Sequence, residues 1–403
     1  MKYIVVCGDG MSDRPLKELG GKTPLEVAKT PNMDYIAGNG EMGLLKTMLE
    51  GLPKDSGVAN LAILGYDPLK YYPGRGPLEA ANMRIQLKED DIIVRCNTIT
   101  VDGNVIVDYS GGHISSAESH ELVNYANEKL GGDDIILYPG VAYRHVGVLK
   151  NHFSDEISCH PPHDIIGGRV DENMILPVDE SAKETADVLN RIMTESKSLL
   201  ENHPVNQRRV AEGKRPANML WFWGAGKKPV MPSFRQLFGL SGSIISAVDI
   251  IKGIGISAGL EVVDVPGATG YLDTNYEGKA DAALKSLERL DFAYVHVESP
   301  DESGHEKNIE HKIQAIEDLD KSVIGRILEK IRGDYVIGVL PDHATPISVG
   351  THTDDPVPFA IYSPKNKKNK RGVGYSEENA KKGVLGMKDA STFMKLLIKT
   401  GKE

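Results

Sequence analysis

The stretch SPDESGH, residues 299–305, places Asp301 and His305 four positions apart, one position after an apolar run at residues 292–297. Side chains of the same two types follow other apolar runs, at Asp9, Asp342 and His343, and His352 lies on the next loop, in GTHTDD. Ligands of open α/β sheets bind beyond the carboxyl ends of the strands, so we expect these groups to converge. Carboxylate and imidazole together suit Mn²⁺, Mg²⁺, Co²⁺ or Zn²⁺, and two such clusters predict two divalent ions.

Each of these groups also has a plain structural interpretation. Asp301 and His305 could form a surface ion pair, Asp9 could cap a helix, and Asp342 with His343 could hydrogen-bond a loop. Taken singly, these structural roles are the more common ones. Several separate strands that all end in metal-ligand residue types favour the metal hypothesis.

A serine lies in a second candidate stretch, KDSGVANLAILGYDP at residues 54–68. Ser56 precedes Gly57 and a helix-like run at residues 58–64, so helix amides would point at whatever its hydroxyl binds. A plain helix N-cap is the structural alternative. Beside two divalent ions, however, a serine hydroxyl can lose its proton and act as a nucleophile, which predicts phosphoryl transfer.

The elements that must position these residues alternate between strands and helices. Apolar runs predict strands at residues 3–7, 219–223, 261–265, 292–297, 335–340 and 358–362. Three- and four-residue spacing of isoleucine and valine predicts helices at residues 244–251 and 309–331. This alternation predicts an α/β fold with a doubly wound, mainly parallel sheet.

The middle of the chain has a different pattern. Short alternating segments at residues 92–96, 105–107 and 144–149 accompany one amphipathic helix at residues 117–130. We therefore expect an inserted α+β domain at residues 80–177 that acts as a substrate-binding lid. Residues 1–79 and 178–403 would form the metal-binding core. The polar run at residues 365–371 predicts a solvated loop.

Composition limits the partners. The chain has 403 residues and a net charge of −10, which argues against a broad nucleic-acid surface. Its three cysteines are widely spaced and favour a reducing compartment over a disulfide framework. No apolar run is long enough for a membrane span. We expect a cytoplasmic enzyme with a small-molecule substrate, and the sequence carries no signal for its oligomeric state.

Five motifs carry a family resemblance, and they are CGDGMSD, DSGVANLAILGYDP, SPDESGH, LPDHATP and GTHTDDPVPFAIY. The chain resembles the alkaline phosphatase superfamily and, within it, the archaeal-type, cofactor-independent phosphoglycerate mutases. The similarity extends along the whole chain and includes YPGRGPLEA, WFWGAGKKP and VPGATGY. It implies interconversion of 3-phosphoglycerate and 2-phosphoglycerate in glycolysis and gluconeogenesis, without 2,3-bisphosphoglycerate.

The resemblance also implies roles for the candidate residues. One metal ion would be held by Asp301, His305 and His352. The other would be held by Asp9, Ser56, Asp342 and His343. Ser56 would be the nucleophile that carries the phosphoryl group between the two half-reactions.

The inserted domain must hold a small anion and manage a proton. His113 in YSGGHISS resembles the histidine that bacterial-type relatives place near the transferred group. Further substrate-binding candidates are Arg75, Arg144, His160, Asp164 and Lys252. Arginine suits a carboxylate or phosphate because its planar fork makes two parallel hydrogen bonds. For each residue, a purely structural hydrogen bond is the common alternative.

Three other functions remain compatible with the sequence. The first is another phosphomutase or phosphomonoesterase of the same superfamily. The second is a nucleotidyl or sulfuryl transferase, which usually has threonine or a modified cysteine at the position of Ser56. The third is a non-catalytic metal-binding protein, which would bind ions without ever acquiring phosphate on Ser56.

Overall fold

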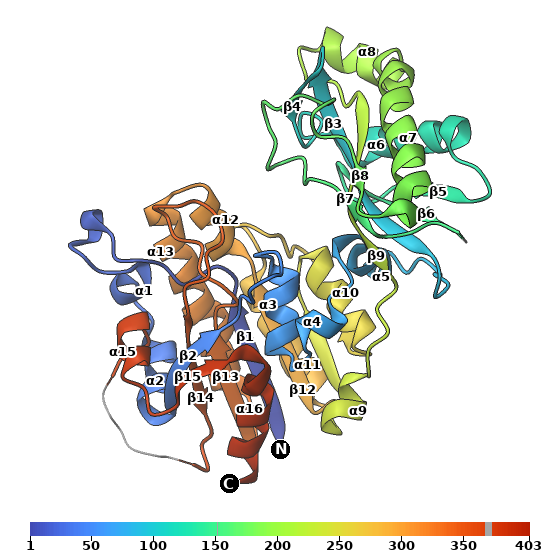
Figure 1. The fold of residues 1–403 in the computed structure, drawn as a ribbon. Helices are drawn as coiled ribbons and strands as arrows, with labels where there is room; N and C mark the ends of the chain where they lie inside the picture. The colour runs from blue at the N-terminus through green and yellow to red at the C-terminus, as the bar shows by residue number, and fades with distance from the viewer. Residues whose placement is uncertain (151, 367–372) are drawn as a thin grey trace. The chain divides into compact units, whose positions relative to one another are not determined.

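The computed structural model describes residues 1–150, 152–366 and 373–403. The chain forms two compact units (Figure 1). The core unit comprises Met1–Tyr72 and Val230–Glu403, and the inserted unit comprises Pro73–Pro229. Among the described residues, no helix combines the length and the apolar character that crossing a bilayer requires. Most of the predicted loop at residues 365–371 lies outside the described residues.

The described part of the core unit is built on an eight-stranded sheet with the order β11-β10-β12-β1-β13-β14-β2-β15. Its strands are β1 (Lys2–Gly8), β2 (Glu41–Lys46), β10 (Gly242–Ile245), β11 (Glu261–Val262), β12 (Phe292–Val297), β13 (Tyr335–Leu340), β14 (Val357–Tyr362) and β15 (Gly386–Asp389). Neighbouring strands are parallel, except that β14 is antiparallel to both β13 and β2. The predicted mainly parallel α/β sheet is confirmed.

Helices cover both faces of this sheet. They are η1 (Lys17–Leu19), α1 (Pro24–Val27), α2 (Pro31–Asn39), α3 (Ser56–Ile63), α4 (Pro68–Tyr71), α9 (Phe234–Phe238), α10 (Asp249–Ser257), α11 (Tyr276–Leu287), α12 (Ser299–His305), α13 (Ile309–Asp318), η3 (Leu319–Gly325), α14 (Arg326–Lys330), α15 (Glu377–Lys381), η4 (Ala390–Thr392) and α16 (Phe393–Lys402). On one face, Val6 and Val295 pack in a cluster with α2, α11 and η3. On the other, Gly338 of β13 lies against Phe393 of α16, and Tyr294 of β12 hydrogen-bonds Asn60 of α3. The sheet is therefore doubly wound, as predicted.

The inserted unit has its own sheet and its own core. Its strands are β3 (Ile92–Asp102), β4 (Val105–Asp108), β5 (Ile135–Tyr138), β6 (Arg144–Leu149) and β9 (Met219–Lys227), with the small pair β7 (Ile157–Ser158) and β8 (Leu176–Pro177). The larger sheet has the order β4-β3-β6-β5, and β9 pairs with β3. Its helices are α5 (Arg75–Asn82), α6 (Ser116–Leu130), η2 (Glu180–Ala182), α7 (Lys183–Glu201) and α8 (Pro204–Ala211).

This unit is longer than the predicted insertion at residues 80–177. Strand β9 pairs antiparallel with β3 from Ile92 to Ile99, so residues assigned to the core by the sequence complete the inserted sheet. The apolar side chains of α7, including Leu189 and Ile192, pack in the same cluster as Trp221 of β9. The predicted strand at residues 219–223 therefore exists, but it belongs to the inserted unit.

Two other element predictions differ from the structure. Ile244 and Ile245 were expected in a helix but form the end of β10, and the helix α10 begins only at Asp249. All four residues of β10 are buried, so the strand shows no alternation between buried and exposed positions. The strand predicted at residues 261–265 is shortened to Glu261–Val262.

Candidate active site

The predicted metal ligands come together at the carboxyl ends of three neighbouring strands. Asp9 follows β1, Asp301 lies in the first turn of α12 after β12, and Asp342 with His343 follow β13. Because β1 lies between β12 and β13, these ends are adjacent. His343 Nε2 lies 3.2 Å from Asp9 Oδ1, and His352 Nε2 lies 3.5 Å from Asp301 Oδ1. The sequence-derived convergence is present in the structure.

Ser56 is the first residue of α3, but it does not cap the helix. The cap is Asp55, whose Oδ1 accepts a 2.7 Å hydrogen bond from the Gly57 amide. The Ser56 hydroxyl instead lies 3.1 Å from His343 Nε2. One turn later, Asn60 Nδ2 donates to the Ser56 carbonyl at 2.8 Å and to Asp342 Oδ2 at 2.7 Å. Helix α3 therefore presents its first side chain to the cluster.

The imidazoles of His305 and His352 face each other through their Nε2 atoms, and protons on both of these atoms would repel each other. His305 Nδ1 lies 3.0 Å from the Gly350 carbonyl, and His352 Nδ1 lies 2.9 Å from the Lys54 carbonyl. A carbonyl oxygen only accepts, so both Nδ1 atoms must donate. The two Nε2 atoms then face each other at 3.2 Å. Two lone pairs at this distance repel each other unless a proton or a metal ion lies between them, and metal-bound histidines characteristically donate their other N–H to a carbonyl.

The third imidazole is oriented in the same way. His343 Nδ1 lies 3.2 Å from Thr345 Oγ1, whose own proton is donated to Asp301. The Thr345 oxygen can then only accept from His343, so Nδ1 carries the proton and the Nε2 lone pair faces Ser56 and Asp9. Burial lowers the pKa of His343 to about 4, with only partial compensation from Asp342, so this imidazole is neutral near pH 7.

The buried carboxylates of Asp9, Asp301 and Asp342 are not balanced by enough positively charged groups of the protein. Burial, together with repulsion from Asp342 and Asp301, raises the pKa of Asp9 well above its usual range. Asp9 Oδ1 has no hydrogen-bond partner among the described residues. Burial would also raise the pKa of Asp301, but hydrogen bonds with His305 and His352 outweigh it and hold that pKa low. Burial opposes charging of His305, yet Asp301 raises its pKa to about 9, so a proton there substitutes for a cation.

The donor set fits divalent ions. Asp301, His305 and His352 each offer one atom within 4.8 Å of the others, as do Asp9, Asp301 and His343. Ligands of one tetrahedral ion lie roughly 3.3 Å apart when the bonds are about 2.0 Å long. The separations of 3.1 Å between His305 Nε2 and Asp301 Oδ2 and 3.2 Å between His343 Nε2 and Asp9 Oδ1 agree with this spacing. This Asp9 Oδ1 atom is buried and has no hydrogen-bond partner among the described residues, which leaves it free to bind an ion.

Sequence reasoning missed several residues of this centre. Thr345 orients both His343 and Asp301, and Asn60 holds Asp342. Thr345 stands two positions after His343 in LPDHATP, and Asn60 stands one helical turn after Ser56, so spacing alone could have suggested both. His296, whose Nε2 lies 3.1 Å from Asp9 Oδ2, lies inside a strand and gave no comparable signal.

The predicted substrate-binding arginines lie in the inserted unit. Arg75 Nε is 3.3 Å from Glu79 Oε1, and its guanidinium carbon lies 5.6 Å from the centre of the Trp223 ring. Arg144 stands on β6, and its buried Nε has no hydrogen-bond partner among the described residues. Arg95, which the sequence did not single out, pairs with Glu79 and lies 4.9 Å from the same Trp223 ring.

Of the remaining candidates, His113, His160 and Asp164 are exposed and Lys252 is partly buried. His113 is exposed, with a φ of 50°, and its amide donates to Ser110 Oγ. His160 and Asp164 are exposed in the same unit, and the His160 carbonyl accepts a hydrogen bond from Trp221 Nε1. Lys252 lies on α10 of the core unit, where its ammonium group lies 2.7 Å from Asp264. The structure thus gathers the predicted metal ligands and Ser56 in one unit and these candidates, apart from Lys252, in the other.

Comparison with known proteins agrees with this geometry. A family model described as 2,3-bisphosphoglycerate-independent phosphoglycerate mutase matches residues 37–206. The 2,3-bisphosphoglycerate-independent phosphoglycerate mutase of Methanosarcina barkeri is 49% identical over 402 residues, which cover 99% of this chain and 100% of that protein. A protein of Geobacter sulfurreducens, named as a probable enzyme of the same kind, is 48% identical over 404 residues, covering 99% and 100%.

Two solved structures resemble the fold over its full length. The PH0037 protein from Pyrococcus horikoshii is 30% identical with a TM-score of 0.84, covering 100% of this chain and 97% of that one. The cofactor-independent phosphoglycerate mutase from Thermoplasma acidophilum is 28% identical with a TM-score of 0.65, covering 100% of both chains. From the full-length identity to its relatives, the chain belongs to the family of 2,3-bisphosphoglycerate-independent phosphoglycerate mutases.

Proposed function

We propose that this protein interconverts 3-phosphoglycerate and 2-phosphoglycerate without 2,3-bisphosphoglycerate, through a phosphorylated Ser56 beside two divalent ions. The names of its full-length relatives support the substrate and the independence from bisphosphoglycerate. The single observation that carries the mechanism is the position of the Ser56 hydroxyl. Because Asp55 caps helix α3, the Ser56 hydroxyl is not used for capping. It lies 3.1 Å from Nε2 of the neutral His343 imidazole, whose lone pair points at it.

The residues of the core unit divide into two ligand sets in this proposal. Asp301, His305 and His352 would hold one ion, and Asp9, Ser56, Asp342 and His343 the other. Mn²⁺, Mg²⁺, Co²⁺ or Zn²⁺ suit these oxygen and nitrogen donors. When bound, such ions lower the pKa of the serine hydroxyl and neutralise the phosphoryl oxygens.

The protein's own residues then carry two balanced half-reactions. Deprotonated Ser56 Oγ, whose proton has passed to solvent, forms a bond to phosphorus while the bond from phosphorus to one glycerate oxygen breaks. That oxygen takes up a proton, for which His113 is the candidate donor. In the second half-reaction the other hydroxyl of glycerate gives its proton back to the same donor group and attacks phosphorus, and the bond from phosphorus to Ser56 Oγ breaks, which restores the deprotonated serine. Water must be excluded while Ser56 carries the phosphoryl group.

A group of arginines in the inserted unit supports a glycerate-binding role. Arg95 and Trp223 are paired residues of β3 and β9, and Arg75 lies against the same indole ring. The Nε of Arg144 is buried without a partner among the described residues, so this guanidinium has a donor to spare. Guanidinium groups bind carboxylates through paired hydrogen bonds. We assign the glycerate carboxylate to this group, with His160 and Asp164 as additional polar contacts.

The experiment uses the full-length protein loaded with Mn²⁺. The protein is incubated with 3-phosphoglycerate in the absence of bisphosphoglycerate, and ³¹P NMR follows the appearance of 2-phosphoglycerate. After quenching, mass spectrometry of the peptide that contains Ser56 should show one added phosphoryl group. The Ser56→Ala variant should lose both signals while retaining its circular dichroism spectrum.

Three results would contradict this function. Full mutase activity in the Ser56→Ala variant would exclude the phosphoserine route. A requirement for bisphosphoglycerate would exclude independence from the cofactor. Release of inorganic phosphate from simple phosphate monoesters, with no isomerisation of phosphoglycerate, would instead identify a phosphomonoesterase.

A further inference from the structure

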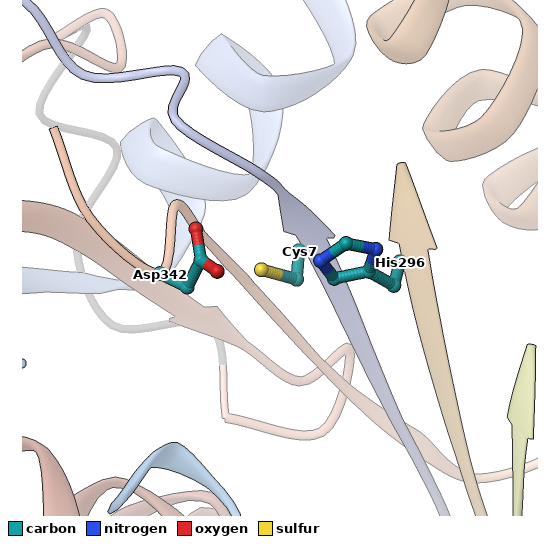
Figure 2. A group of neighbouring side chains, drawn as sticks. All are labelled: Cys7, His296 and Asp342. Carbon is teal, nitrogen blue, oxygen red and sulfur yellow. The ribbon is translucent and has the colours of Figure 1, made fainter. Parts of the chain in front are cut away.

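Cys7, His296 and Asp342 form a second group of potential metal ligands, next to the proposed catalytic centre in the core unit. Cys7 of β1 and His296 of β12 are directly paired in the parallel register. Paired residues of neighbouring strands project to the same face, and here it is the face opposite Val6 and Val295. Asp342 follows β13, the other neighbour of β1. Figure 2 shows the sulfur of Cys7 between the imidazole and the carboxylate.

The three side chains are close together and sealed from solvent. Cys7, His296 and Asp342 each offer one ligand atom within 4.8 Å of the other two. All three residues are 0% exposed. An exposed group of this kind would often be a chance arrangement of solvated residues, whereas burial removes water as a partner and leaves the ligand atoms to the protein or to an ion.

His296 provides an independent indication of a ligand. Its Nδ1 lies 3.3 Å from Ser246 Oγ, which can accept the proton of that nitrogen. Its Nε2 is buried, points towards Cys7, and makes no hydrogen bond with any of the described residues (Figure 2). Asp9 Oδ2 lies 3.1 Å from this Nε2, a separation close to that of two ligands on one tetrahedral ion. An imidazole held at Nδ1 with a free Nε2 is the arrangement that metal-binding histidines adopt.

We propose that Cys7, His296 and Asp342 bind a third divalent cation, separate from the two ions of the catalytic centre, with Asp9 Oδ2 within reach as a fourth ligand. Sulfur, nitrogen and oxygen donors together suit a borderline ion such as Zn²⁺ better than Mg²⁺. The thiol of Cys7 gives its proton to solvent as the sulfur–metal bond forms. Asp342 bridges this ion and the catalytic centre.

The role of this ion follows from the charges around it. Asp9, Asp301 and Asp342 are three buried carboxylates at neighbouring strand ends. Like charges buried this close together repel one another. A cation beneath Asp9 and Asp342 offsets this repulsion and fixes both carboxylates for the catalytic ions above them.

Cobalt substitution tests the proposal because only this site contains sulfur. The full-length protein is stripped of metal with a chelator and titrated with Co²⁺ alone. Thiolate bound to Co²⁺ gives a charge-transfer absorption in the near ultraviolet, whereas the proposed catalytic ligands offer only oxygen and nitrogen. We expect this absorption to saturate with about one sulfur-bound ion per chain, and total binding to reach about three ions.

Matched variants assign the absorption. Cys7→Ser should lose it and bind about one ion fewer, and His296→Gln should weaken it. Cys96→Ser and Cys159→Ser should leave it unchanged, because both cysteines lie in the inserted unit. The chain has three cysteines, so the double variant of Cys96 and Cys159 retains only Cys7. This double variant tests the site even if Cys7→Ser fails to fold.

Two outcomes overturn the proposal. One is the absence of charge-transfer absorption in the double variant at saturating Co²⁺. The other is absorption that survives in a folded Cys7→Ser variant. Neither readout depends on mutase activity, so the result is independent of the function proposed above.

Discussion

At the scale of single residues, Thr345 connects the two proposed metal ligand sets. Its hydroxyl donates to Asp301 and accepts from His343 Nδ1, which fixes one carboxylate and one imidazole tautomer. Thr345→Val keeps the shape of the side chain but removes both contacts. We expect Mn²⁺ affinity to fall by about 10- to 100-fold, as measured by isothermal titration calorimetry.

Thr345→Ser is the matched control for this variant. It retains the hydroxyl and should bind Mn²⁺ almost as tightly as the unmodified protein. Equal affinities for the Val and Ser variants would show that the hydroxyl does not orient the ligands. Unfolding midpoints of the metal-free proteins separate this effect from a general loss of stability.

The buried His145 of the inserted unit should make the free energy of unfolding depend on pH, and this effect does not involve metal binding. The Gly140 amide donates to its Nδ1 at 3.0 Å, and its Nε2 faces Thr98 Oγ1. Burial, assisted by His120 and Arg95, lowers its pKa to about 3. His145 therefore binds a proton below pH about 6.5 in the unfolded chain, but only below pH about 3 in the folded chain. Stability is lost as pH falls through this window, by up to ~1.4 kcal/mol per pH unit.

Replacing this histidine should flatten the acid side of the stability profile. We expect His145→Gln to lose less free energy of unfolding than the unmodified protein between pH 6.5 and pH 4, measured by urea unfolding. Because Trp221 and Trp223 both lie in the inserted unit, tryptophan fluorescence reports its unfolding directly. Parallel profiles for the two proteins would mean that His145 titrates normally in the fold.

At the scale of elements, the loop after β1 depends on Gly10. Gly10 has a φ of 58°, and a Cβ atom there would lie 2.5 Å from Asp301 Oδ1 and 2.6 Å from Thr345 Oγ1. Gly10→Ala should therefore both strain the backbone and displace two residues of the metal centre. We expect loss of high-affinity Mn²⁺ binding and of mutase activity.

Gly20 provides the control for backbone strain. It also has a positive φ, 67°, but nothing lies within 4 Å of an added Cβ atom. Gly20→Ala should lower stability by about 1 kcal/mol and leave metal binding intact. Similar Mn²⁺ affinities for the two variants would rule out a specific role for the close approach at Gly10.

The elements that carry the centre were predictable because their signals are local. Strands β1, β12 and β13 are short buried runs, and each is followed within four residues by a carboxylate of the site. Prediction failed where a local pattern suited two structures, as at Ile244 and Ile245, which have helical spacing to Val248 and yet pair in a strand. It also failed for β9, because the sequence does not reveal which sheet a buried strand joins.

The site was predictable to the same degree. Carboxylates and imidazoles at strand ends can be read from residue type and position alone. The partners that orient them could not, because Thr345, Asn60 and the carbonyls of Gly350 and Lys54 act through contacts between distant segments. The function of the inserted residues, from Arg75 to Asp164, stays a prediction.

At the scale of the whole molecule, metal removal should affect the two units differently. Every proposed metal ligand belongs to the core unit, whereas both tryptophans of the chain belong to the inserted unit. Ions that bind only the folded core stabilise that unit by mass action. Chelation should therefore lower the unfolding temperature seen by circular dichroism and leave the tryptophan fluorescence transition unchanged. A shift of both transitions by the same amount would contradict independent unfolding of the units.

The core unit is discontinuous in the chain, and this sets an order on its assembly. Asp9 and Ser56 precede the inserted unit, and Asp301, Asp342, His343 and His352 follow it. The inserted unit of a nascent chain can thus fold on the ribosome before the second half of the metal ligands has been synthesised. A chain released from the ribosome before Asp301 would lack every ligand that follows the inserted unit, so such a fragment could form neither of the two proposed catalytic ion sites.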